Sequence, residues 1–288
     1  MSIVSNMLML RRRLRKELQY AAMRHVFPIT DTERVIASHS NRIFANSIPK
    51  AGTNLLSRLL KLMPNVVPWW TYHIDETIPG YSHQLSSGRK GQVITAHLPW
   101  SPSLLQELEH LEFRKLLIVR DMRDVAVSGA YYVTHMDRSH PLHDYLNSLP
   151  NDDERLMAMI KGVAAEHYPG GQIPPMWEND SYKSFLPWVD DPDNLLVRFE
   201  DLIGAMGGGD DNLQEKTIRK IASHIGTDLD AEQFEHIRSS LFSTSSRTFR
   251  KGQVGEWRNH FNEAHKQAFK DMSGYMLIRM GYEKNNDW

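Results

Sequence analysis

The chain has 288 residues, and its 34 Lys and Arg against 35 Asp and Glu give a formal net charge of −1. This length is enough to bury a large core, and 41% hydrophobic with 24% charged residues excludes the disordered and fibrous classes of protein. The balanced charge argues against a nucleic-acid partner, and the absence of cysteine excludes disulfide frameworks, thiolate metal sites and cysteine nucleophiles and suits a cytoplasmic protein.

Residues 1–40 predict a basic helix followed by a lead-in to the main domain. Leu10, Leu14 and Leu18 recur at helical spacing, with basic residues between them. The apolar run is short and precedes the charges, unlike a secretory signal, and no later segment is long enough to span a bilayer. We favour a helix that packs its leucines on the main domain, and the alternative is peripheral contact with an anionic membrane or a partner.

Residues 41–288 predict a single domain of the α/β class. Four apolar runs read as strands: Arg42–Ser47, Gln92–Ala96, Lys115–Val119 and Asn194–Phe199. The runs are continuous, which is typical of strands covered on both faces, and helical patterns alternate with them. This alternation predicts a central parallel sheet flanked by helices.

Two later segments interrupt the alternation. Residues 137–193 are rich in Pro, Gly, His and Trp and predict an insertion of helices and long loops. Residues 206–210 contain three successive glycines and predict a flexible surface turn.

The loop after the first strand has the composition of an anion-binding site. Gly52 permits close backbone approach, Thr53 and Asn54 offer donors, and Lys50 adds a positive charge at a helix N-terminus. The loop lacks the Gly-Lys-Ser/Thr ending of the nucleoside triphosphatases. Taken alone, it is explained equally well by a lysine on an exposed turn with a helix-capping threonine.

The third strand leads to a second candidate anion site. Arg120 ends the strand, and Ser128 lies eight residues on, about two turns into the next helix. Together they can grip a phosphate, because the planar guanidinium makes paired hydrogen bonds to oxyanions. Alternatively, Arg120 is an ion-pair partner of Asp121 or Asp124. We expect Arg123 and Asp124 to cap the helix or to pair on the surface.

A third segment, residues 249–257, supplies two adjacent cations and two glycines, a loop able to wrap an anion. With this segment, the chain resembles the soluble, cytosolic-type sulfotransferases that use 3′-phosphoadenosine 5′-phosphosulfate (PAPS). The family's 5′-phosphosulfate loop resembles residues 48–54, and its 3′-phosphate motif resembles residues 119–128. Its Arg-Lys-Gly-x-x-Gly-x-Trp signature is present from Arg250 to Trp257. The three matches occur in the family's order, which makes their joint occurrence the strong signal.

The resemblance implies a P-loop-like sulfotransferase fold. It also implies that a sulfuryl group is transferred from PAPS to a small organic acceptor, at a hydroxyl group in the favoured case and at an amine in the less favoured one. The product would be 3′,5′-adenosine bisphosphate (PAP). His97, in a Thr-Ala-His-Leu-Pro setting, would be the general base, and Lys50 would stabilise the charge on the leaving group. The implied cofactor-binding residues are Lys50, Ala51, Gly52, Thr53, Asn54, Arg120, Ser128, Phe242, Arg250, Lys251 and Gly252. We expect no metal, because no histidine has metal-ligand spacing supported by other ligands.

Three positions depart from the family's pattern. Thr95 stands where a lysine usually precedes the histidine by two residues, and Phe199 replaces an aromatic hydroxyl residue before Glu200. Leu55 replaces the tryptophan that often stacks on adenine, a role that Phe242 can take instead.

The acceptor is left open by the sequence. Aromatic and histidine side chains either line an acceptor pocket or pack in the core, the commoner fate of such residues. The candidates are Trp69, Trp70, Tyr72, His73, Tyr81, His83, Trp100, Tyr131, Tyr132, His135, His140, His143 and Trp177. A lipid or glycan acceptor is the first alternative, because the N-terminal helix is basic. A nucleotide-dependent kinase on a related sheet is the second.

Overall fold

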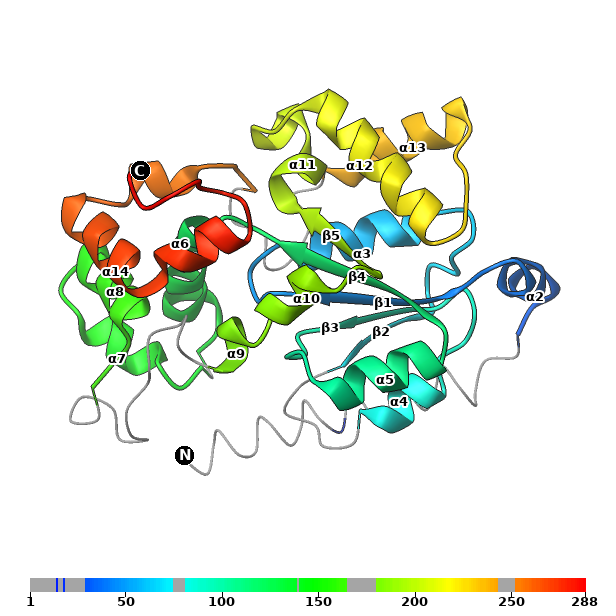
Figure 1. Ribbon diagram of the computed structural model, residues 1–288, viewed down its shortest axis with the longest axis horizontal. Coiled ribbons are helices and arrows are strands. Elements are labelled where there is room, and N and C mark those ends of the chain that lie inside the picture. The colour runs from blue at the N-terminus through cyan, green and yellow to red at the C-terminus, as the bar shows by residue number, and fades with distance from the viewer. Residues whose placement is uncertain are drawn as a thin grey trace.

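A parallel β-sheet forms the centre of the molecule (Figure 1). The structure is a computed structural model and describes residues 14, 18, 29–74, 81–138, 140–164, 180–242 and 252–288. Within these residues, five strands lie in the order β2-β3-β1-β4-β5, and every neighbouring pair is parallel. The strands are β1 (Arg42–Ser47), β2 (Thr71–Ile74), β3 (Val93–Ala96), β4 (Phe113–Val119) and β5 (Asn194–Arg198).

Four of these strands confirm the sequence prediction to within two residues, and β2 is additional. β2 has only four residues and lies at the edge of the sheet, where its side chains alternate between half-buried and buried. Such a short segment lacks the continuous apolar run by which the other four strands were recognised.

Helices cover both faces of the sheet, because successive side chains of a buried strand point to opposite sides. On one face, Ile43 and Ala45 of β1 pack with α3 (Thr53–Leu62), α12 (Asp211–His224) and α13 (Ala231–Leu241). On the other face, Phe44 belongs to a hydrophobic cluster that includes apolar side chains of three further helices. These are α5 (Pro102–His110), α6 (Met122–Tyr131) and α14 (Glu263–Arg279).

Shorter elements complete the described chain. The insertion expected at 137–193 contains α7 (His143–Ser148), α8 (Asp152–Lys161), α9 (Asp180–Lys183) and α10 (Leu186–Asp190). α6 runs directly into a π-helical turn, η1 (Tyr132–Met136). The remaining elements are α2 (Asp31–Ser38), α4 (Ser82–Ser86), α11 (Phe199–Ile203), η3 (Ala205–Gly207) and η4 (Glu256–Asn259).

The expected basic N-terminal helix lies outside the described residues except at two positions. Leu14 and Leu18 are 54% and 70% exposed, so packing of these two leucines on the main domain is not found. No helix in the described part of the chain has the length and apolar character needed to cross a membrane.

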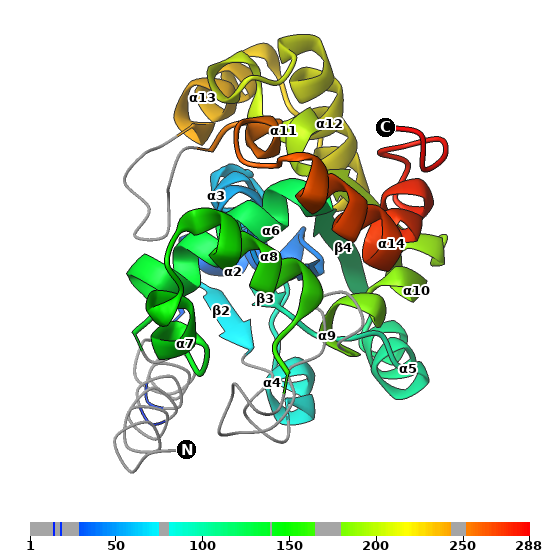
Figure 2. The same ribbon diagram turned by 90° about the vertical axis from the view of Figure 1, so that its left-hand side faces the viewer.

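The carboxyl ends of the strands meet at one edge of the sheet, where open α/β sheets place their ligands. α6, α7, α8 and α14 stand at this edge, and α2 lies at the opposite edge (Figures 1 and 2). The loops that follow β1, β3 and β4 therefore lie at the same edge of the sheet as α6.

Candidate functional site

The loop after β1 turns tightly into α3. Lys50 and Gly52 both have positive φ, at 66° and 114°. A Cβ atom on Gly52 would lie 2.7 Å from Cδ2 of Phe199 and 3.1 Å from Cδ1 of Ile118, so glycine is required for both its conformation and its contacts. Gly52 has no side chain that caps α3, and the first N–H groups of the helix therefore point toward the loop.

Lys50 is half-buried, which contradicts the alternative of an exposed turn lysine. Its Nζ lies 3.7 Å from the centroid of the Tyr132 ring. Burial lowers the pKa of Lys50 to about 8, the positive charge of Arg120 acts in the same direction, and the Asp137 carboxylate opposes both. The ammonium is therefore the predominant form at pH 7, but it titrates within the range of ordinary assays.

His97 is held by the end of β1. Its Nδ1 lies 2.8 Å from the carbonyl oxygen of Ser47 and 3.1 Å from Ser47 Oγ, which in turn is 2.6 Å from Thr53 Oγ1. Because a carbonyl oxygen only accepts, the neutral ring is protonated at Nδ1, and Nε2 carries the lone pair. This is the arrangement that a general base requires.

Asn46 and Ser47 are positioning residues that sequence analysis missed. The side-chain amide of Asn46 donates to Leu98 O at 2.8 Å, and its Oδ1 accepts from Leu98 N at 3.0 Å. These bonds fix the chain that follows His97 to β1. Their only sequence signal is two polar residues at the end of an otherwise apolar strand.

Arg120 is 8% exposed and makes the ion pair that was considered as an alternative to an anion site. Its Nη2 donates to Gln253 O at 2.7 Å and lies 3.6 Å from Asp124 Oδ2, so the structural ion pair exists. Its guanidinium lies over the Phe199 ring, 4.4 Å from Cζ to the centroid. Nε is buried and has no hydrogen-bond partner among the described residues. That donor is available for an oxyanion.

The expectation that Arg123 and Asp124 pair on the surface is wrong. Asp124 is buried and accepts from the backbone N–H groups of Gly255 at 2.9 Å and Trp257 at 2.8 Å. Burial raises the pKa of Asp124, and the Arg120 charge and the two N–H groups oppose this rise. The first turn of α6 faces the signature loop rather than solvent, and the helix cap is Asp121.

The glycine-rich turn at 206–210, which we predicted to be a flexible surface turn, is exposed at Met206, Gly208 and Asp210 but also supports the signature loop. Gly207 O accepts from Val254 N at 2.9 Å, and Met206 O accepts from Gln253 Nε2 at 3.2 Å. A Cβ on Gly207 would lie 2.7 Å from Gly252 O. Gly207 is therefore needed for the close packing of the two loops.

The structure thus places the predicted residues in two groups. Lys50, Ala51, Gly52, Thr53 and His97 gather at the ends of β1 and β3, and Arg120 contacts the loop that contains Gly252. Asn54 is exposed, and Ser128 and Phe242 are half-buried in the second half of α6 and just after α13. Arg250 and Lys251 lie outside the described residues.

Several aromatic candidates for the acceptor pocket pack elsewhere. Trp70 and Tyr72 are buried, and Trp69 is exposed with its Nε1 donating to Glu33. Trp177 lies outside the described residues. No cluster of His, Asp and Glu among the described residues could hold a metal ion.

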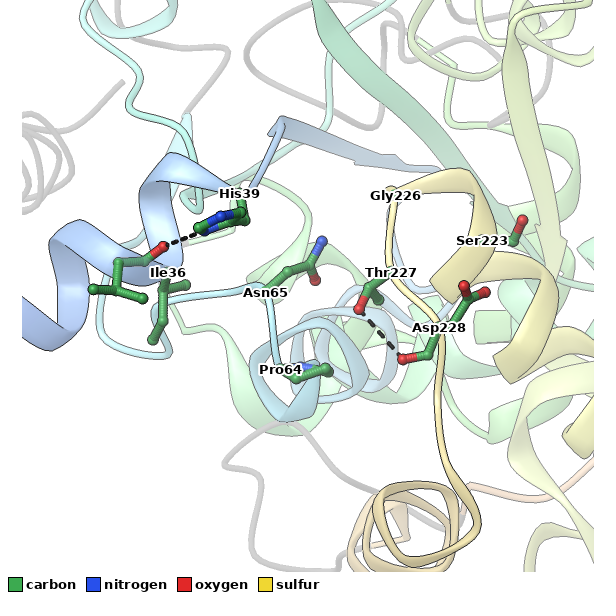
Figure 3. Close-up of a pocket in the computed structure, with 9 residues that line it drawn as sticks. Ile36, His39, Pro64, Asn65, Ser223, Gly226, Thr227 and Asp228 are labelled. Carbon is green, nitrogen blue, oxygen red and sulfur yellow. Dashed lines mark hydrogen bonds between the residues drawn. The ribbon is translucent and has the colours of Figure 1, made fainter.

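An open cavity of about 590 Å³ lies away from both groups (Figure 3). Its lining includes His39, which precedes β1, and Asn65 and Gly226, which follow α3 and α12. It therefore belongs to the amino-terminal edge of the sheet, and none of the predicted site residues lines it.

Comparisons with known proteins bear on these groups. A family model described as a sulfotransferase domain matches residues 40–281. The 3-alpha-hydroxysteroid sulfotransferase of the guinea pig (Cavia porcellus) is 24% identical, over 79% of this chain and 82% of its own length. Sulfotransferase 1B1 of the dog (Canis lupus familiaris) is 24% identical, over 92% of this chain and 96% of its own length. The crystal structure of mouse sulfotransferase SULT7A1 complexed with PAP has 19% identity and a TM-score of 0.59, covering 88% of this chain and 90% of that one. The structural likeness shows a shared fold.

Proposed function

This chain belongs to the sulfotransferase family, and from that premise we propose how its residues move a sulfuryl group from PAPS to an acceptor hydroxyl. The order of the strands carries the proposal. β3, β1 and β4 are neighbours, and they end at His97, the Lys50 loop and Arg120. Base, sulfuryl site and 3′-phosphate site then follow one another along a single edge of the sheet.

The two anion sites fit the two ends of PAPS. The N-terminus of α3, together with Lys50, Thr53 and Asn54, offers N–H groups and positive charge to the 5′-phosphosulfate. Arg120 would offer its buried Nε to the 3′-phosphate, and we assign Ser128 and the Gly252 loop to the same site. The adenosine would lie between the two sites, with Phe242 stacked on its adenine ring. Arg250 and Lys251 complete the 3′-phosphate site in this proposal.

In the transfer step, Nε2 of His97 takes the proton of the acceptor hydroxyl as its oxygen bonds to sulfur. The bond between sulfur and the bridging oxygen breaks, and its electron pair stays on PAP. The Lys50 ammonium stabilises that developing negative charge. A positioned base of this kind contributes about 10²–10⁴-fold to the rate.

We further propose that the acceptor is a small organic molecule held beside η1. Tyr132 brings this turn to Lys50, and Tyr131 and His135 pack together on it with ring centroids 4.6 Å apart. The guinea-pig relative is named for a hydroxysteroid, which is an acceptor of this type. The chain contains no cysteine, and we propose that it works in the cytoplasm.

Replacement of the base tests this proposal. We expect His97→Ala to bind PAP with normal affinity in calorimetry but to lose sulfation of every acceptor that the parent accepts in a mass-spectrometric screen. His110→Ala, an exposed histidine at the end of α5, is the matched control and should keep full activity.

A thermal-shift measurement distinguishes a sulfotransferase from the alternative of a nucleotide-dependent kinase. PAP at about 100 times its dissociation constant should stabilise the protein by about 2.7 kcal/mol, and ATP with Mg²⁺ should not. A rise in melting temperature with ATP and Mg²⁺, but not with PAP, would favour a kinase. In the experiment on the base, full activity of His97→Ala would contradict the assignment of His97.

A further inference from the structure

The insertion reaches the sulfuryl site through one tyrosine. Tyr132 opens the π-helical turn η1, and turns of this kind occur often at functional sites. The face of its ring lies against the Lys50 ammonium, 3.7 Å from Nζ to the centroid. Its hydroxyl donates to Asp137 Oδ2 at 3.3 Å, and Asp137 N donates back to Tyr132 O at 3.0 Å. The ring and the carboxylate therefore form one unit.

Asp137 is 9% exposed, and a buried carboxylate is costly unless positive charges or donors surround it. Among the residues that the structure describes, the charged groups that act on Lys50 are Arg120 and Asp137. Asp137 also faces His140, whose backbone N–H donates to the Asp137 carbonyl. Arg120 repels the ammonium of Lys50. Asp137 alone among these groups attracts it.

We propose that Asp137 is the counter-ion of Lys50 and that Tyr132 is the ring that positions its ammonium at the sulfuryl site. Both are positioning residues, since they act through Lys50. The proposal rests on the proposed function, because the role of Lys50 in stabilising the leaving group comes from there.

The balance of charges explains why the lysine needs such a partner. Burial and Arg120 both favour the neutral amine, which cannot stabilise an anionic leaving group. The pKa of about 8 is what results with Asp137 in place. Without the carboxylate, Lys50 would be deprotonated to a greater extent at neutral pH.

The titration of Lys50 in the free protein tests this inference without any donor or acceptor. Lysines are labelled by reductive ¹³C-methylation, and the Lys50 signal is identified by its loss in Lys50→Arg. We expect Asp137→Asn and Asp137→Ser to lower the midpoint of the Lys50 titration by about half a unit or more. Two variants are used so that the measurement does not depend on the folding of one. Asp144→Asn removes the same charge from an exposed position of α7 and should leave the midpoint unchanged. An unchanged or raised midpoint in the Asp137 variants would overturn the proposal.

The affinity for PAP distinguishes a counter-ion from a structural residue. At pH 6.5, where Lys50 is protonated, removal of a nearby negative charge should leave the PAP affinity of Asp137→Asn equal to or tighter than that of the parent. Weaker binding would show that Asp137 builds the donor site, against the proposal. If the parent itself does not bind PAP, the proposed function fails, while the comparison of Lys50 midpoints still decides the role of Asp137.

Discussion

Lys50 carries a charge that changes within the pH range of ordinary assays. Burial and Arg120 lower the pKa of its ammonium to about 8, compared with 10.5 in water. The positive charge is present below this pH and is lost as the pH rises through it. The attraction that Lys50 exerts on the 5′-phosphate of PAP should be lost over the same range, because that phosphate is already ionised there.

We therefore predict that the affinity for PAP, measured by calorimetry from pH 7 to pH 9.5, falls about tenfold with a midpoint near or above pH 8. Bound anions favour the ammonium, so the midpoint in the complex lies on the alkaline side. Lys50→Arg is the control, because a guanidinium stays protonated throughout this range. A similar fall in Lys50→Arg would assign the pH dependence to another group.

At the scale of elements, the first turn of α6 is tied to the signature loop by one carboxylate. Asp124 accepts from Gly255 N and Trp257 N with its two oxygens. Asparagine keeps the shape but offers one oxygen, and its NH₂ group would face a backbone donor. One buried N–H then loses its partner, which costs about 1–3 kcal/mol.

We predict that Asp124→Asn lowers the free energy of unfolding by that amount in urea. Amide hydrogen exchange at Gly255 and Trp257 should become faster, while exchange in the middle of α12 follows only the change in global stability. Asp228→Asn, an exposed substitution, should change neither. Unchanged exchange at the two amides would mean that other contacts hold the loop.

The same elements show what the sequence can predict. The continuous apolar runs of β1, β3, β4 and β5 record burial on both faces, and that pattern is local. The hydrogen-bond partners of Asp124, in contrast, are distant in sequence: Gly255 and Trp257 lie more than 130 residues away. The packing of the turn at 206–210 against Gly252 is equally hidden from the sequence, because glycine is common both in tight packing and in exposed turns. The site residues could be proposed only because they match the motifs of a known family, which place them together without knowledge of these distant contacts. Their roles remain predictions.

At the scale of the whole molecule, a buried arginine joins segments that are far apart in the chain. Arg123 pairs with Asp121 and with Glu283, each at 2.7 Å. Its guanidinium contacts the rings of both Trp257 and Trp288, 4.1 and 4.4 Å from the two centroids. The start of α6, the signature segment and the last residues of the chain thus meet at one side chain.

We predict that Arg123→Met lowers the free energy of unfolding by about 3–5 kcal/mol, because two partly buried carboxylates lose their partner. Arg219→Met is the matched control. Arg219 also pairs with a glutamate, Glu215 at 2.8 Å, and lies over a ring, that of Phe234, but it is exposed on α12. Solvent screens such a pair, and its loss should cost about 0–1 kcal/mol. Equal losses in the two variants would mean that burial adds nothing to the Arg123 cluster. Glu283→Gln combined with Arg123→Met should recover part of the loss, since it removes one of the carboxylates left without a partner.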